Sequence, residues 1–268
     1  MTRCRWPIRP RRTGGQLQAD KRWRWAAASR VGTSHVRQGT RKQDAFSVSL
    51  SAQGSLCAVI SDGAGSASLG GEGASLVCRA LSCHFREWFD RKERLPGDGR
   101  IVCWIDDLRD RLGRAASNRN VERRQLAATL VLLAVCGDEA LCLHIGDGAV
   151  VARKGSQWET VSTPESGEFA STTFFVTDDP EARLRARRID TGYDAFALFS
   201  DGIESVALEQ ATLAPSPRFF EPMLRPIDQA SEQGRLGALS GALGRYLDSK
   251  AVCDRTDDDK TLILLSSR

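Results

Sequence analysis

The chain of 268 residues is poor in the residues that build several common kinds of functional site. It has only three histidines, so a metal site built on imidazole nitrogens is poorly supplied. Its eight cysteines form no CxxC pair, which argues against a zinc site or a dithiol redox motif. A GxSxG motif is absent, and so is a CxxxxxR loop with a glycine-rich cradle, so nucleophilic serine or cysteine chemistry lacks its usual signature.

Long apolar runs are also missing. None approaches the roughly 20 residues needed to span a bilayer, and the basic start of the chain is not followed by the apolar region of a signal peptide. Several cysteines lie inside apolar segments, where a reduced cysteine acts as a small hydrophobe. We therefore predict a protein of the reducing cytoplasm with no membrane partner.

Positive charge is concentrated at the N-terminus. Residues 1–25 carry eight Arg and Lys against one Asp, and subtracting this excess of seven from the net charge of +4 leaves −3 for the rest. We predict a basic, disordered tail over residues 1–22 and one folded domain over 23–268. A tail that binds nucleic acid is the alternative interpretation, and it predicts steeply salt-dependent binding.

The hydrophobic pattern alternates pairs of strands with pairs of helices. Strands are expected over 45–50, 55–61, 128–136, 140–146, 149–155, 157–162, 194–200 and 261–265. Helices are expected over 74–88, 101–112, 216–228 and 231–248, with residues 163–194 irregular apart from a short apolar stretch. Two strands followed by two helices, in two rounds, favour an α+β fold in which two central antiparallel sheets are flanked by helices.

Three apolar runs end in Asp-Gly, at Asp62, Asp147 and Asp201, and a fourth run is preceded by the acidic triplet 257–259. A single Asp-Gly is most often a tight turn. Four acidic sites at strand margins, together with Asp44, predict a cluster of carboxylates that would repel one another unless cations neutralise them. Mg²⁺ or Mn²⁺ suits such oxygen ligands, and a pair of these ions can activate water for attack on phosphorus.

Six motifs in order resemble the protein phosphatase 2C family of metal-dependent serine/threonine phosphatases, in particular its bacterial branch. The segments that carry the resemblance are GTSHVRQGTRKQDAF (32–46), VISDGAGSASLGGEGA (59–74), ATLVLLAVCGDEALCLHIGDGAVV (128–151), GEFASTTFFVT (167–177), FALFSDGIES (196–205) and DDDKTLILL (257–265). Of these, 167–177 resembles the family's flap. The resemblance spans about residues 23–265 and implies a four-layer αββα sandwich.

The resemblance also implies roles for the acidic residues. Asp62 would bridge two Mg²⁺ or Mn²⁺ ions, with the Gly63 carbonyl on one of them. Asp201 and Asp258 would complete the second ion's protein ligands, and Asp147 with Asp201 would hold a weaker third ion. Asp44 would act from the outer shell through water. The other two members of the acidic triplet are expected to be exposed.

The residues that grip phosphate depart from the family pattern. The family's phosphate-binding arginine falls on Gly39, so Arg37 or Arg41 is the candidate to replace it. Gln43 stands where many relatives have Glu, and the histidine that often follows the central Asp-Gly is missing. His35 is the candidate to substitute for that histidine as general acid.

The resulting expectation is a phosphoprotein phosphatase that hydrolyses phosphoserine or phosphothreonine with water activated by a two-metal centre. Its partners would be phosphorylated proteins, the targets of a serine/threonine kinase or that kinase itself. The alternative is a pseudophosphatase, a regulatory binding module with the same fold and little turnover, which the departures at Gly39 and Gln43 and the missing histidine favour.

Overall fold

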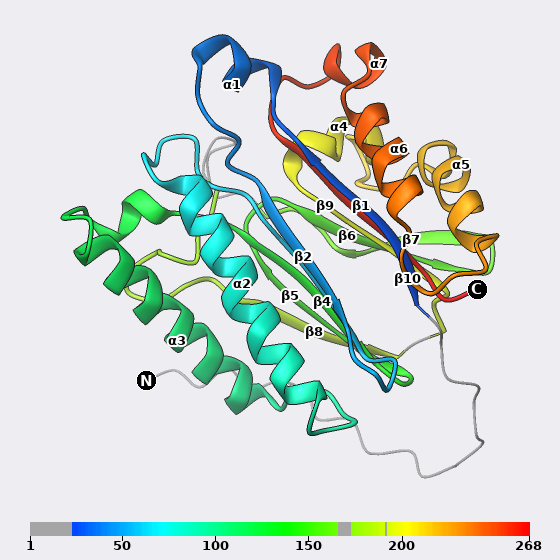
Figure 1. The fold of residues 1–268 in the computed structure, drawn as a ribbon, viewed down its shortest axis with the longest axis horizontal. Coiled ribbons are helices and arrows are strands. Elements are labelled where there is room, and N and C mark those ends of the chain that lie inside the picture. The colour runs from blue at the N-terminus through cyan, green and yellow to red at the C-terminus, as the bar shows by residue number, and fades with distance from the viewer. Residues whose placement is uncertain (1–22, 166–172, 191) are drawn as a thin grey trace.

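Two β-sheets face one another across the centre of the molecule, and helices cover the outer face of each (Figure 1). The computed structural model describes residues 23–165, 173–190 and 192–268. The predicted tail over 1–22 and the first part of the predicted flap therefore lie outside the described residues. The predicted α+β sandwich with the layer order αββα is confirmed.

The first sheet has six strands in the order β10-β1-β11-β9-β6-β7. Their bounds are β1 Arg24–Arg30, β6 Ala149–Lys154, β7 Gln157–Ser162, β9 Ala195–Phe199, β10 Gly234–Arg235 and β11 Lys260–Ser266. The second sheet has five strands in the order β2-β3-β4-β5-β8. Their bounds are β2 Ala45–Leu50, β3 Leu56–Ser61, β4 Leu130–Cys136, β5 Glu139–Ile145 and β8 Arg185–Asp190. The pairing of neighbouring strands is antiparallel except between β1 and β10.

The helices pack in two groups. Helices α2 (Gly70–Phe89) and α3 (Asp98–Ser117) cover the second sheet, and α5 (Pro217–Asp228) and α6 (Gly237–Leu247) cover the first. Short helices complete the chain: α1 Thr33–Gln38, α4 Glu204–Ala207, α7 Lys250–Cys253, and the 3₁₀ turns η1 Arg123–Leu126 and η2 Asp201–Ile203. Among the described residues, none of the helices combines the length and hydropathy needed to cross a bilayer.

Strand β4 shows why the central strands are apolar along their whole length. Its residues Leu130 and Leu132 face the helical layer, while Val131 and Val135 face the other sheet. Because successive side chains of a strand point to opposite faces, a strand buried on both faces must be apolar at every position. The four-layer arrangement therefore follows from these continuous apolar runs.

Two sequence predictions need correction. The segment expected to be irregular contains β8, a strand of sequence RARRID that pairs with β5 at the edge of the described sheet. Because it is rich in arginine, β8 has no hydrophobic pattern by which the sequence could reveal it. One of these arginines, Arg187, donates a hydrogen bond to the carbonyl of Val161. The last predicted helix begins at Gly237 and not at 231, because Gly234 and Arg235 pair with β1 as a short parallel strand.

Candidate metal centre

The antiparallel register gathers the acidic residues at one end of the sandwich. In the first sheet, Phe199 at the end of β9 pairs with Ala149 at the start of β6 and with Leu262 near the start of β11. Residues that follow β9 or precede β6 and β11 therefore lie together, which brings Asp201, Asp147 and Asp258 to the same edge. In the second sheet Ala45 pairs with Ser61, so Asp44 and Asp62 meet in the same way.

Most of the predicted site residues line one cavity of about 560 Å³. Those that line it are His35, Asp62, Gly63, Asp147, Asp201 and Asp258. Asp44 is 4% exposed and interacts with Asp62 from below the cavity surface. Arg37 and Arg41 are not among the lining residues. The structure thus brings the carboxylates together and leaves the two arginines outside this cavity.

The turn at Asp62 and Gly63 is fixed from two sides. Asp62 and Thr129 are joined by two hydrogen bonds, from the Asp62 amide to the Thr129 hydroxyl at 3.0 Å and from the Thr129 amide to the Asp62 carbonyl at 2.8 Å. A Cβ atom on Gly63 would clash with the carbonyl group of Gly70 at the start of α2. Only glycine permits this approach, so the Asp-Gly pair here is a packing requirement as well as a turn.

Asp44 joins the two sheets beneath the cavity. Its Oδ2 accepts hydrogen bonds from the hydroxyls of Ser200, at 2.8 Å, and Thr261. Its buried Oδ1 has no partner among the described residues. Burial raises the pKa of this carboxyl to about 6. One oxygen of Asp44 is thus anchored by protein, and the other is available to a water molecule.

The electrostatics of the cavity favour a cation. Burial, followed by the charges of Asp147 and Asp258, raises the pKa of Asp201 to about 8. Burial and then the charge of Asp44 raise the pKa of Asp62 well above its ordinary value. The buried Oδ1 of Asp201 has no partner in the part of the chain that the structure describes. Carboxylates that repel one another, with a buried oxygen of Asp201 left unpartnered, are a fit for hard divalent ions.

Protein ligands alone do not complete the site. Within the described ranges, no group of three or more acidic, histidine or cysteine side chains is placed to hold a metal ion by itself. The carboxylates instead surround a space large enough for several waters. Mg²⁺ commonly keeps several waters and uses only one or two carboxylates, so this open arrangement suits Mg²⁺ or Mn²⁺ better than a closed site for zinc.

Asp147 is held by the C-terminal part of the predicted flap. Its Oδ2 accepts a hydrogen bond from the hydroxyl of Thr173, and burial raises the pKa of its carboxyl. Thr173 also lines the cavity. A cation bound at Asp147 would therefore be coupled to the position of this segment.

Asp259 is an important residue that sequence reasoning missed. The expectation that both neighbours of Asp258 are exposed is wrong for Asp259, which is 1% exposed. Its Oδ1 accepts from the Gly32 amide at 2.6 Å and is bonded to His35 Nδ1 at 3.0 Å, while its Oδ2 accepts from the amides of Gln43 and Asp44. Asp259 thereby fixes the loop that carries His35 and Asp44 against the start of β11.

The remaining candidates occupy different surroundings. His35 lines the cavity, with Nδ1 held by Asp259. Arg37 forms an exposed ion pair with Asp257 at 2.8 Å. Arg41 lines a neighbouring cavity that shares part of its wall with the first. Of the two arginines proposed to grip phosphate, Arg41 is thus the one that lines the adjoining cavity.

Replacing Asp259 by Ala is expected to lower the free energy of unfolding by about 3 kcal/mol, since it leaves several buried backbone N–H groups without an acceptor. Urea unfolding in the presence of EDTA measures this loss without a contribution from bound metal. Asp257→Ala removes an exposed neighbour and should change stability by less than about 0.5 kcal/mol. Equal losses in the two variants would refute the positioning role of Asp259.

Comparisons with known proteins agree with one another. The sequence profile of the family described as Protein phosphatase 2C matches residues 31–247. Serine/threonine-protein phosphatase 3 of Escherichia coli (strain K12) is 34% identical over 247 residues, which cover 90% of this chain and 97% of that protein. Similar folds occur among solved structures. Serine/threonine phosphatase Stp1 from Staphylococcus aureus has a TM-score of 0.62 at 16% identity, covering 95% of this chain and 98% of that chain. The Mycobacterium tuberculosis serine/threonine phosphatase PstP/Ppp has a TM-score of 0.62 at 16% identity, covering 91% and 98%.

Proposed function

The chain belongs to the protein phosphatase 2C family. We propose that it is a phosphoprotein phosphatase that hydrolyses phosphoserine and phosphothreonine with the help of divalent metal ions. The observation that carries the proposal is the convergence of Asp62, Asp147, Asp201 and Asp258 on one cavity. Their mutual repulsion and the unpartnered oxygen of Asp201 among the described residues support metal binding.

The metal ligands would be those that the resemblance implies. Asp62 and the Gly63 carbonyl would hold the first ion, with Asp62 bridging to a second that is completed by Asp201 and Asp258. Asp147 and Asp201 would hold a third. When bound, such ions neutralise the phosphate oxygens and lower the pKa of a water positioned to attack phosphorus.

The other residues position groups and move protons. Asp44, with Oδ2 fixed by Ser200 and Thr261, would use its other oxygen, Oδ1, to accept a hydrogen bond from a water molecule and so orient it. His35, in its protonated form, would give the Nε2 proton to the departing serine or threonine oxygen, because Nδ1 is held by Asp259. Arg41 would contact the phosphate, while Arg37 is already paired with Asp257.

The proposal extends to the substrates and to the compartment. The substrates would be phosphorylated proteins produced by a serine/threonine kinase. The seven cysteines in the described part of the chain are all free, which supports the proposed reducing compartment.

Removing metal is expected to abolish hydrolysis of a phosphothreonine peptide. Phosphate release is measured after dialysis against EDTA and again after Mn²⁺ or Mg²⁺ is restored. The proposal predicts loss of activity on chelation and recovery on addition of either ion, whereas Ca²⁺, with its larger and more flexible coordination, should restore less. Tight metal binding without hydrolysis of any phosphopeptide would contradict the proposal and support the pseudophosphatase alternative.

A further inference from the structure

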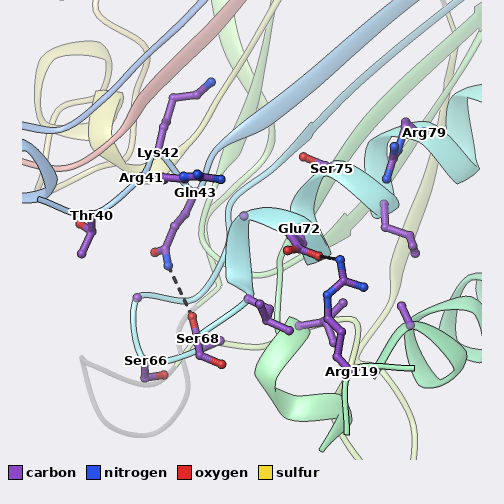
Figure 2. A pocket seen from close by; sticks show the side chains of 17 residues that line it. Thr40, Arg41, Lys42, Gln43, Ser66, Ser68, Glu72, Ser75, Arg79 and Arg119 are labelled. Carbon is purple, nitrogen blue, oxygen red and sulfur yellow. Dashed lines mark hydrogen bonds and ion pairs between the residues drawn. The ribbon is translucent and has the colours of Figure 1, made fainter. Parts of the chain in front are cut away.

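A second cavity of about 930 Å³ adjoins the candidate metal centre (Figure 2). Gln43, Gly65 and Ser66 line both cavities, so the two spaces share a wall. The second cavity lies between the loop that precedes β2, the first turns of α2 and the C-terminal end of α3. A ligand whose reacting group lies among the carboxylates can therefore extend directly into it.

The wall of this second cavity is strongly basic. Among the described residues, four cationic side chains line it, from Arg41, Lys42, Arg79 and Arg119, against the single carboxylate of Glu72. The three arginines come from three separate elements, the loop after α1, helix α2 and the turn after α3. Their convergence on one cavity contrasts with the acidic lining of its neighbour.

These cations are only partly neutralised by the protein. Arg119 forms an ion pair with Glu72, as Figure 2 shows. Within the described residues, neither Arg41 nor Arg79 has a hydrogen bond or ion pair to another side chain. Lys42 points its Nζ to the Ser29 hydroxyl, and burial lowers its pKa, so it is not the group that a ligand would meet. The unneutralised charge therefore rests on guanidinium groups, which bind carboxylates and phosphates through paired N–H donors.

Resting on the proposed phosphatase function, we propose that this basic cavity is a second anion-binding subsite for the phosphoprotein substrate. It binds a carboxylate or a second phosphate that lies a few residues from the phosphoserine or phosphothreonine being hydrolysed. An extended peptide advances about 3.3–3.6 Å per residue, so side chains several positions from the reacting residue reach the adjoining cavity. Arg79 and Arg119 are the specificity residues, and neither is required for the chemistry.

The test compares two phosphothreonine peptides and one small ester. The acidic peptide is made as a series, with the acidic residue placed in turn at each position from one to five residues on either side of the phosphothreonine. The neutral peptide carries glutamine or serine at those positions. The small ester, p-nitrophenyl phosphate, is too small to reach the subsite. The protein should hydrolyse the best acidic peptide with a kcat/KM at least about tenfold above the neutral one, as expected for one charge-assisted contact. A phosphothreonine peptide that also carries a phosphoserine at the best position should show a larger increase in kcat/KM than one with glutamate there.

The double variant Arg79→Gln/Arg119→Gln should bring this ratio close to one and leave p-nitrophenyl phosphate hydrolysis unchanged. Arg86→Gln is the matched control, because Arg86 lies two turns further along the same face of α2 and does not line the cavity. The preference should persist in that variant. A ratio that is unchanged in the double variant, or that falls equally in the control, would overturn the subsite.

Failure of the proposed function is distinguishable from failure of the subsite. If the protein hydrolyses none of the three substrates, the proposed function fails, and the subsite is tested by calorimetric binding of acidic and neutral peptides that carry a non-hydrolysable phosphonate. Tighter binding of the acidic peptide to the unmodified protein than to the double variant supports the subsite. Equal binding of both peptides overturns it.

Discussion

Replacing Asp62 by Asn is expected to reduce kcat/KM for a phosphothreonine peptide by about 10³-fold or more. The proposed function makes Asp62 the carboxylate shared by the first and second ions, so its loss weakens both at once. Metal ions supply several kcal/mol of charge stabilisation in such reactions, and each 1.36 kcal/mol corresponds to a factor of ten in rate. No other single carboxylate in the cavity should have so large an effect.

The measurement is initial-rate phosphate release over a range of Mn²⁺ concentrations. If the Asp62→Asn substitution only weakened metal affinity, activity would return at high Mn²⁺; if the bridging charge is essential, a large deficit remains at saturation. Asp254→Asn is the matched control, because Asp254 is an exposed residue that forms an ion pair with Lys250 at the end of α7. Full activity in the Asp62→Asn variant would refute the assigned role.

Replacing Asp201 by Asn is expected to have opposite effects on stability without and with metal. At alkaline pH it should stabilise the metal-free protein, and it should destabilise the metal-bound protein. Folding raises the pKa of Asp201 from its ordinary 3.8 to about 8, so the folded protein holds this proton more tightly than the unfolded chain does. The stability that it contributes is full below about pH 4 and is lost as the pH rises through about 8. Above that pH the metal-free protein must bury the charge among other carboxylates.

Thermal unfolding in EDTA between pH 5.5 and pH 8.5 measures this effect. The unmodified protein should lose more of its Tm over that range than the Asp201→Asn variant, which has no carboxylate to ionise there. In saturating Mn²⁺ the unmodified protein should instead have the higher Tm. Metal at 100 times its Kd stabilises the folded state by about 2.7 kcal/mol, and the variant has lost a ligand. Identical pH profiles, with the same gain from Mn²⁺, would contradict the assignment of Asp201 to the cation site.

The parts of the fold that sequence predicts well are those whose burial is visible in the residue types. Strands β3, β4, β9 and β11 are apolar at nearly every position because both of their faces are covered. Strand β8 lacks that pattern because it is an edge strand rich in arginine. Helix α1 has no buried residue, so it leaves no periodic hydrophobic pattern to find.

In the candidate metal centre, too, some residues are visible in the sequence and others are not. Aspartates at the ends of apolar runs are visible in the sequence, and antiparallel pairing explains why they meet. The role of Asp259 is not visible, because most of its partners are backbone amides, among them those of Gly32 and Gln43, which lie 227 and 216 residues away in the chain. A backbone donor has no residue-specific signature, so only the tertiary structure identifies such a positioning residue.

The basic cavity illustrates a third limit. Arg41, Arg79 and Arg119 are separated along the sequence and stand in an ordinary background of charged residues. Their spacing in the sequence does not indicate that they form a group. They meet at the wall of the second cavity because α2 packs against α3 and the loop before β2 packs against α2. Charge clusters built across elements in this way are a property of the fold.

The strand-end carboxylates are proposed to form a divalent-cation centre, and a crystal of the protein soaked in Mn²⁺ shows whether they do. Anomalous scattering at the manganese edge locates the ions independently of any assumption about ligands. We expect two strong peaks, one bounded by Asp62 and the Gly63 carbonyl and the other by Asp62, Asp201 and Asp258, with a weaker peak near Asp147. An absence of peaks in this cavity, in crystals whose protein still releases phosphate from a phosphopeptide, would contradict the claim.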